Sequence, residues 1–109
     1  MSTTKSAHFL ADVELTYEWY ALNAGWEVAE RYLGAIEATC ALIASHPRIG
    51  TAVEFLHPRL ASWRFLVVMR PFHRHIVFYE ATDGGTIFRR AMHGHRDLPR
   101  RLREAPGAG

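Results

Sequence analysis

The stretch that decides the fold is residues 74–93, which reads RHIVFYEATDGGTIFRRAMH. Two segments rich in β-branched and aromatic residues flank a turn at Thr82-Asp83-Gly84-Gly85. Asp-Gly and Gly-Gly pairs tolerate positive φ angles and are typical of tight hairpin turns. The stretch therefore predicts two antiparallel strands, Arg74–Ala81 and Thr86–His93.

A third strand is predicted upstream of this hairpin, because Trp63–Met69 is a dense apolar run of residues that favour β structure. We expect these strands to form an antiparallel meander, and Lys5–Leu10 is a candidate for a short fourth strand at its edge. Beyond the hairpin, Asp97–Glu104 predicts a brief helical turn, and residues 105–109 predict a disordered tail.

In the first half of the chain, the apolar residues recur with the period of an α-helix. Asp12–Asn23 contains neither Pro nor Gly, and Trp26–Ser45 carries an apolar stripe at Val28, Tyr32, Ile36, Cys40 and Ile43. Asn23-Ala24-Gly25 predicts a helix end and a tight turn, so the two helices should form an antiparallel hairpin. The predicted fold class is α+β, with this N-terminal hairpin packed on a three- to four-stranded antiparallel sheet in one domain over residues 1–104.

Length and composition limit the class of protein. The chain has 109 residues, 49% of them hydrophobic, which is enough for one domain with a core. No apolar run reaches the roughly 18 residues that span a bilayer, so we expect no membrane association. Residues 1–6 lack the apolar stretch of a signal peptide, and we expect a cytoplasmic protein. The lone Cys40 excludes a disulfide within the chain and a multi-cysteine zinc site.

Charge is distributed unevenly along the chain. Residues 1–58 carry three basic and seven acidic residues, whereas residues 59–109 carry ten arginines and four acidic residues. The planar guanidinium of arginine suits carboxylates and phosphates. The second half therefore predicts a surface that meets an anionic partner, either nucleic acid or an acidic protein segment.

The seven histidines raise the question of a metal site. His73 and His75 are two residues apart, as are His93 and His95, and four imidazoles at neighbouring strand ends are zinc ligands in principle. No Cys, Asp or Glu lies close in sequence to complete the site. We therefore expect incidental histidines, and neither a metal nor a cofactor.

Four segments, in this order, resemble motifs of one family of bacterial proteins. They are Asp12-Val13-Glu14 leading to Tyr17 and Tyr20, Ser45-His46-Pro47-Arg48-Ile49-Gly50, Trp63-Arg64-Phe65-Leu66 followed by His75-Ile76-Val77-Phe78-Tyr79, and Arg90-Ala91-Met92-His93-Gly94-His95-Arg96-Asp97-Leu98. The chain resembles the ParE/RelE superfamily, the toxins of type II toxin–antitoxin pairs, and is most similar to the ParE branch.

The resemblance implies a plasmid-stabilising toxin that is neutralised by a cognate antitoxin. An antitoxin of this kind has an acidic C-terminal segment that wraps the toxin in a hetero-oligomer. The ParE branch implies inhibition of DNA gyrase and of replication by protein contact, without catalysis. The candidate partner-binding residues are Arg64, Arg70, Arg74, Arg90, His93 and Arg96.

RelE-like relatives imply an alternative function, a ribosome-dependent mRNA endoribonuclease. His93 would then act as an acid or base, Arg96 would occupy the basic position that follows the last strand in those enzymes, and the scissile phosphate would be held by Arg64, Arg70 and Arg74. This chain has a single lysine and no aromatic residue after Phe88, so it lacks the sheet lysines and the late tyrosine of those enzymes. The non-catalytic interpretation is favoured. A weakly toxic relative that only binds its antitoxin is a second alternative.

The pair Arg89-Arg90 lies within the last predicted strand. Strand neighbours face opposite sides, so one of these guanidinium groups must point inward, where it needs a partner. By resemblance to the Arg-x-x-His ending of the family, Arg90 is the expected one.

Overall fold

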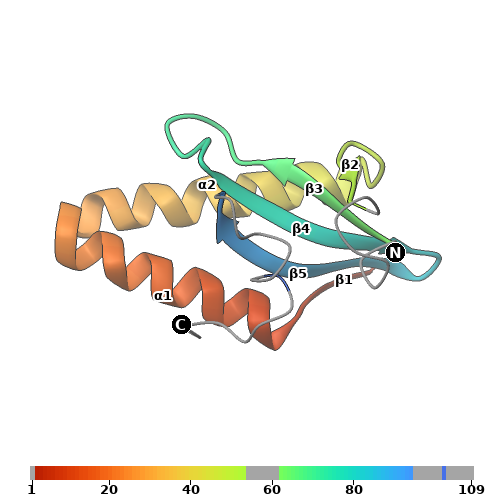
Figure 1. The fold of residues 1–109 in the computed structure, drawn as a ribbon, viewed down its shortest axis with the longest axis horizontal. Helices are drawn as coiled ribbons and strands as arrows, with labels where there is room; N and C mark the ends of the chain where they lie inside the picture. The colour runs from red at the N-terminus through yellow and green to blue at the C-terminus, as the bar shows by residue number, and fades with distance from the viewer. Residues whose placement is uncertain (1, 54–61, 95–101, 103–109) are drawn as a thin grey trace.

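A computed structural model describes residues 2–53, 62–94 and 102 of the chain. Its elements are β1 (Ser2–Lys5), α1 (Ala7–Ala24), α2 (Trp26–Ser45), β2 (Thr51–Ala52), β3 (Trp63–Val67), β4 (His75–Thr82) and β5 (Gly85–His93). The strands form one sheet in the order β1-β5-β4-β3-β2 (Figure 1). The predicted α+β class is confirmed, and α2 has the predicted bounds.

The sheet differs from the prediction in two respects. It has five strands instead of three or four, and it is mixed, because β1 pairs with β5 in parallel while the other neighbours are antiparallel. The edge strand expected at Lys5–Leu10 lies at Ser2–Lys5 instead, since Ser6 ends it by capping α1: its Oγ accepts from the Phe9 N–H at 3.1 Å. The predicted C-terminal helical turn and tail, residue 102 excepted, lie outside the described residues.

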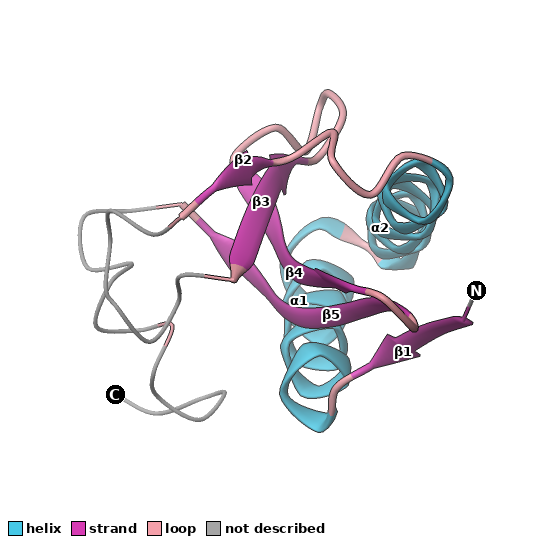
Figure 2. Ribbon diagram, turned by 90° about the vertical axis from the view of Figure 1, so that its right-hand side faces the viewer, coloured by secondary structure: helices cyan, strands magenta, loops and turns pink. Residues whose placement is uncertain are grey.

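Both faces of the sheet are buried, each by a different cluster. Figure 2 shows both helices on the same side of the sheet. The helix-facing core includes the predicted α2 stripe, with Tyr32, Ile36, Cys40 and Ile43 buried against Val77, Tyr79, Phe88 and Ala91. Phe78, between Val77 and Tyr79, belongs to the second cluster on the opposite face, together with Val53, Met92 and Leu102. Leu102 therefore packs on this opposite face of the sheet.

A β-bulge in β5 sets which residues face the helices. Phe78 pairs with Arg90 and Tyr79 pairs with Phe88, so Arg89 is an extra residue in the ladder. Phe88 and Ala91 are three residues apart, and a regular strand would place them on opposite faces. The bulge allows both to enter the helix-facing core.

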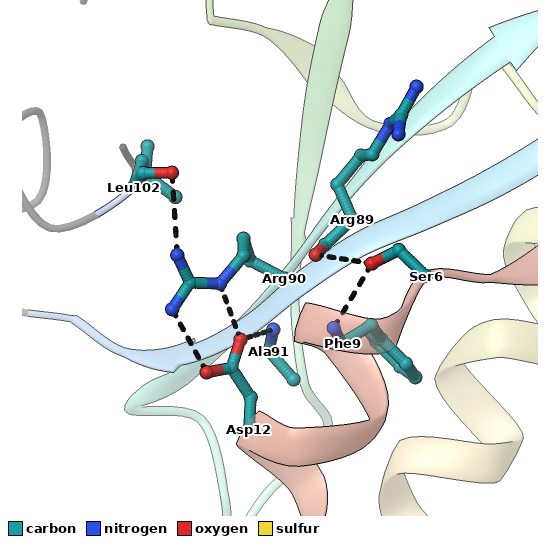
Figure 3. A network of polar contacts seen from close by, with 7 residues as sticks. All are labelled: Ser6, Phe9, Asp12, Arg89, Arg90, Ala91 and Leu102. Carbon is teal, nitrogen blue, oxygen red and sulfur yellow. Dashed lines mark hydrogen bonds and ion pairs between the residues drawn. The ribbon is translucent and has the colours of Figure 1, made fainter. Parts of the chain in front are cut away.

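Side chains at the start of α1 cover the part of β5 that β1 leaves unpaired. The pairing of β1 with β5 ends at Phe88. Beyond it, Ser6 Oγ donates to the Arg89 carbonyl at 2.9 Å, and Asp12 Oδ2 accepts from the Ala91 N–H at 3.0 Å (Figure 3). These contacts satisfy backbone groups that an open sheet edge would expose.

Arg90 is the buried arginine, as predicted, and Asp12 is its partner. Arg90 Nε donates to Asp12 Oδ2 at 2.7 Å, and Nη2 donates to Oδ1 at 3.0 Å. The two residues are only 3% and 8% exposed. Arg90 Nη1 also lies 3.4 Å from the Leu102 carbonyl (Figure 3). One guanidinium thus connects α1, β5 and Leu102.

We expect Asp12→Ala to lower the free energy of unfolding by about 3–5 kcal/mol, because it leaves the Arg90 charge buried without its carboxylate. The double variant Asp12→Leu/Arg90→Met should recover part of this loss, since it removes the charge as well. Urea denaturation of each variant measures the effect.

The matched control is Arg89→Ala, which breaks the partly exposed Arg89–Glu80 pair and should cost less than about 1 kcal/mol. Equal losses in Asp12→Ala and Arg89→Ala would contradict the special role of the buried pair.

Candidate partner-binding surface

One end of the sheet gathers exposed basic side chains. Arg70, His73 and Arg74 are exposed in the connection between β3 and β4. The Gly94 N–H donates to the Arg74 carbonyl at 2.7 Å, which brings the end of β5, with the exposed His93, beside this connection. We call these four residues the basic end of the sheet. Residues 62–79 contain no acidic residue, so the positive charge there is not offset locally.

Arg64 lies elsewhere on the sheet and is held by the backbone. Its Nη1 donates to the Gly50 carbonyl at 2.8 Å. In the ladders, Arg64 is opposite Tyr79 and His93 is opposite His75. Their partners on β4, Tyr79 and His75, are four residues apart, which is roughly 13 Å of strand. Arg64 and His93 therefore do not converge on one point.

The Pro-x-x-Gly segment after α2 has a structural explanation. Tyr79 Oη donates to the Pro47 carbonyl at 2.7 Å and accepts from the Gly50 N–H at 2.9 Å. A Cβ atom at Gly50 would lie 2.6 Å from the Phe65 carbonyl oxygen and 2.7 Å from Tyr79 Oη. Only glycine fits there without displacement of β3, so this motif positions β2 and β3 on the sheet.

Of the two remaining predicted site residues, only Arg90 is among the described residues. Arg90 is buried and bonded to Asp12, so its guanidinium serves the fold. Arg96 lies outside the described residues. Among the described candidates, the structure therefore brings together Arg70, Arg74 and His93.

His75 has a role that the sequence did not reveal. Its Nε2 lies 2.8 Å from Tyr20 Oη, and its ring packs against Tyr32, Phe72 and His93, with the His93 centroid at 5.2 Å. Burial, with a smaller effect of His93, lowers the pKa of His75 to about 4. The imidazole is therefore neutral near pH 7 and joins α1 to β4.

This placement separates the histidines that the zinc hypothesis grouped. His75 is 6% exposed, whereas His73 is an exposed loop residue and His95 lies outside the described residues. Within the part of the chain that the structure describes, no group of three or more His, Cys, Asp or Glu side chains is arranged to hold a metal ion.

The helical layer carries the opposite charge to the basic end. Residues 7–45 contain six acidic residues and one arginine. An open groove of about 310 Å³ runs between α1 and α2, and its lining includes the apolar Phe9, Val13, Leu33 and Ile36, the carboxylates of Glu14, Glu30 and Glu37, and one cation, Lys5. The molecule thus presents a basic sheet end and an acidic helical layer.

We expect the free energy of unfolding to decrease as the pH is lowered, because of His75. The unfolded chain takes up a proton on this residue near pH 6.5, whereas the folded chain does so only near pH 4. The unfolded state therefore binds more protons between these values. His75 should lower the free energy of unfolding by up to about 1.4 kcal/mol per pH unit as the pH falls from 6.5 to 4.

Urea denaturation at pH 7, 6 and 5 tests this expectation. The slope with pH should be shallower in His75→Gln than in the wild type, and unchanged in the control His73→Gln, which alters an exposed residue. Identical slopes in the wild type and His75→Gln would rule out His75 as the cause.

A helical hairpin on a mixed sheet, with Arg70 and Arg74 exposed at one end, defines a small α+β domain. The family model described as "ParE toxin of type II toxin-antitoxin system, parDE" matches residues 4–98. The chain belongs to this family, and the family predicted from the sequence is confirmed.

A solved structure supports the fold. The chain is similar to a structure titled "Chromosomal ParDE TA system from P. aeruginosa", with a TM-score of 0.72 and 17% sequence identity. The match covers 87% of this chain and 97% of that one. The comparison with curated proteins finds no match. Within the described residues, neither α1 nor α2 is long and apolar enough to cross a membrane.

Proposed function

We propose that this chain is the toxin of a type II toxin–antitoxin pair that inhibits DNA gyrase, and hence replication, by protein contact. Membership of the ParE toxin family is the observation that carries the proposal. The toxin would act in the cytoplasm, and a cognate antitoxin would neutralise it by forming a hetero-oligomer with it.

The distribution of charge supports an acidic antitoxin segment. Arg70 and Arg74 are exposed at the basic end of the sheet, with no carboxylate in residues 62–79. A surface of one sign raises the association rate of a partner of the opposite sign. The acidic helical layer would repel the same segment, so the antitoxin tail should approach from the sheet side.

Charge reversal tests this approach. We expect Arg70→Glu/Arg74→Glu to reduce the association rate with the purified cognate antitoxin at least tenfold at low salt. The difference should shrink as ionic strength rises, because salt screens exposed charges. Stopped-flow fluorescence measures the rates.

The control is Arg31→Glu, which reverses an exposed charge on α2, in the acidic layer. Equal association rates for this variant and for the double variant would exclude the basic end as the approach surface.

The cellular target is tested by following DNA and protein synthesis after controlled induction. A gyrase inhibitor should stop thymidine incorporation early while methionine incorporation continues. Early loss of methionine incorporation would instead support the alternative function, mRNA cleavage. Growth that is unaffected, together with tight antitoxin binding, would support the weakly toxic alternative.

The mRNA endoribonuclease is the second candidate, and the position of His93 favours it. His93 is exposed at the end of β5, beside the basic connection that carries Arg74, where it is accessible to an RNA phosphate. Under this alternative, His93→Ala or Arg96→Ala should abolish mRNA cleavage while antitoxin binding is retained. If both variants still block thymidine incorporation and no cleavage occurs, the gyrase proposal stands.

A further inference from the structure

The connection between β3 and β4 is built as two consecutive turns. The Phe72 N–H donates to the Met69 carbonyl at 3.0 Å, and the His75 N–H donates to the Phe72 carbonyl at 2.9 Å. Phe72 and His75 are each 6% exposed, whereas Arg70 and Arg74 are exposed. Each turn therefore ends on a buried ring and leaves a cation of the basic end in solvent.

The two buried rings dock on the helical hairpin. The Phe72 ring makes edge contacts with Tyr20 of α1 and Tyr32 of α2, with centroid distances of 5.6 and 5.8 Å. The His75 ring lies in the same cluster, with its centroid 5.1 Å from that of Tyr32 and its Nε2 2.8 Å from Tyr20 Oη. The position of the basic end relative to the two helices therefore depends on Phe72 and His75.

The groups that face His75 are neutral or basic. It meets the Tyr20 phenol from α1, the Tyr32 phenol from α2, and the imidazole of His93, its partner in the ladder, from β5. Burial raises the pKa of both phenols. Residues 68–74 of the connection contain no acidic residue. Among the described residues, no carboxylate lies within ion-pair distance of His75.

A proton on His75 is therefore unfavourable while the connection is docked. Burial, with a smaller effect of His93, lowers the pKa of His75 to about 4. Opening of the connection would return the imidazole to water, where its pKa is about 6.5. The open state binds the proton more tightly, so a lower pH favours opening. These two pKa values predict that the ratio of open to docked molecules rises about twentyfold from pH 7 to pH 5.

We propose that Phe72, His75 and Tyr20 form an acid-sensitive latch, which fastens the basic end of the sheet to the helical hairpin and is released by protonation of His75. The start of α1 is held separately by the buried pair of Asp12 and Arg90, so the latch opens without unfolding the domain. This inference goes beyond the proposed function, because the latch positions the basic end for any anionic partner.

Amide hydrogen exchange of the full chain at pH 7, 6 and 5, followed by NMR, tests the latch. The reporters are three N–H groups whose acceptors lie in the connection, those of Phe72, His75 and Gly94. We expect their protection factors to fall about twentyfold from pH 7 to pH 5, through a local opening that is insensitive to low urea. The Ala91 N–H, which is bonded to α1, should stay more strongly protected and should show that the fold is intact.

Matched variants identify the group that takes up the proton. His75→Gln keeps a hydrogen-bonding side chain beside Tyr20 but does not titrate, so the protection factors of the reporters should change less than about twofold between pH 7 and pH 5. The control His73→Gln alters the exposed histidine of the same connection and should keep the full change. Exchange of the reporters only together with Ala91, or a full pH effect in His75→Gln, would exclude the latch.

The effect on binding is measured at pH 7 with Phe72→Ala, which keeps both arginines but removes the ring that docks them. Reporter exchange should rise roughly tenfold or more, and association with the purified antitoxin should slow about threefold or more. If Arg70→Glu/Arg74→Glu slows association and Phe72→Ala does not, the positioning role is wrong. If neither slows it, the antitoxin does not approach through the basic end, and the exchange data alone decide whether the latch exists.

Discussion

The buried pair of Asp12 and Arg90 fixes how the two layers of the molecule meet. Of the residues of α1, only Phe9 and Asp12 are buried, and Val13 and Tyr20 pack against the core from partly buried positions. Asp12 accepts hydrogen bonds from the Arg90 guanidinium and from the Ala91 N–H. It thereby satisfies a buried cation and a sheet-edge amide together. Sliding α1 along β5 would break both interactions and leave a charge buried without a partner.

The far half of α1 is held at a second point. The buried residues of α1 lie in its first two turns, and Tyr20, bonded to His75, holds the later part against β4. The other faces of the helix need not pack on the sheet. Leu15, Trp19 and Leu22 of α1 are accordingly exposed to solvent.

Local patterns in the sequence predicted the helices and strands better than the contacts between distant residues. The Asp83-Gly84 turn was sufficient to predict the β-hairpin, and the apolar stripe was sufficient to predict α2, because each pattern depends on residues close together in the sequence. The need of Arg90 for a buried partner was also predictable, but Asp12 lies 78 residues away and no local signal identifies it. β1 was misplaced because Ser2–Lys5 is exposed throughout and has no hydrophobic alternation. Similarly, His73 and His75 look alike in sequence, and only packing on Tyr20 and Tyr32 distinguishes them.

The placement of the charged groups bears on the choice between binding and catalysis. Phosphodiester cleavage requires a base, an acid and cations that converge on one phosphate. In the described part of the chain, Arg64 is bonded to the Gly50 carbonyl and Arg90 to Asp12, so neither guanidinium is directed at the exposed His93. The remaining charge is sorted into a basic sheet end and an acidic helical layer. Because Arg64 and Arg90 are held away from His93, the geometry supports the proposed toxin that works by contact over the endoribonuclease.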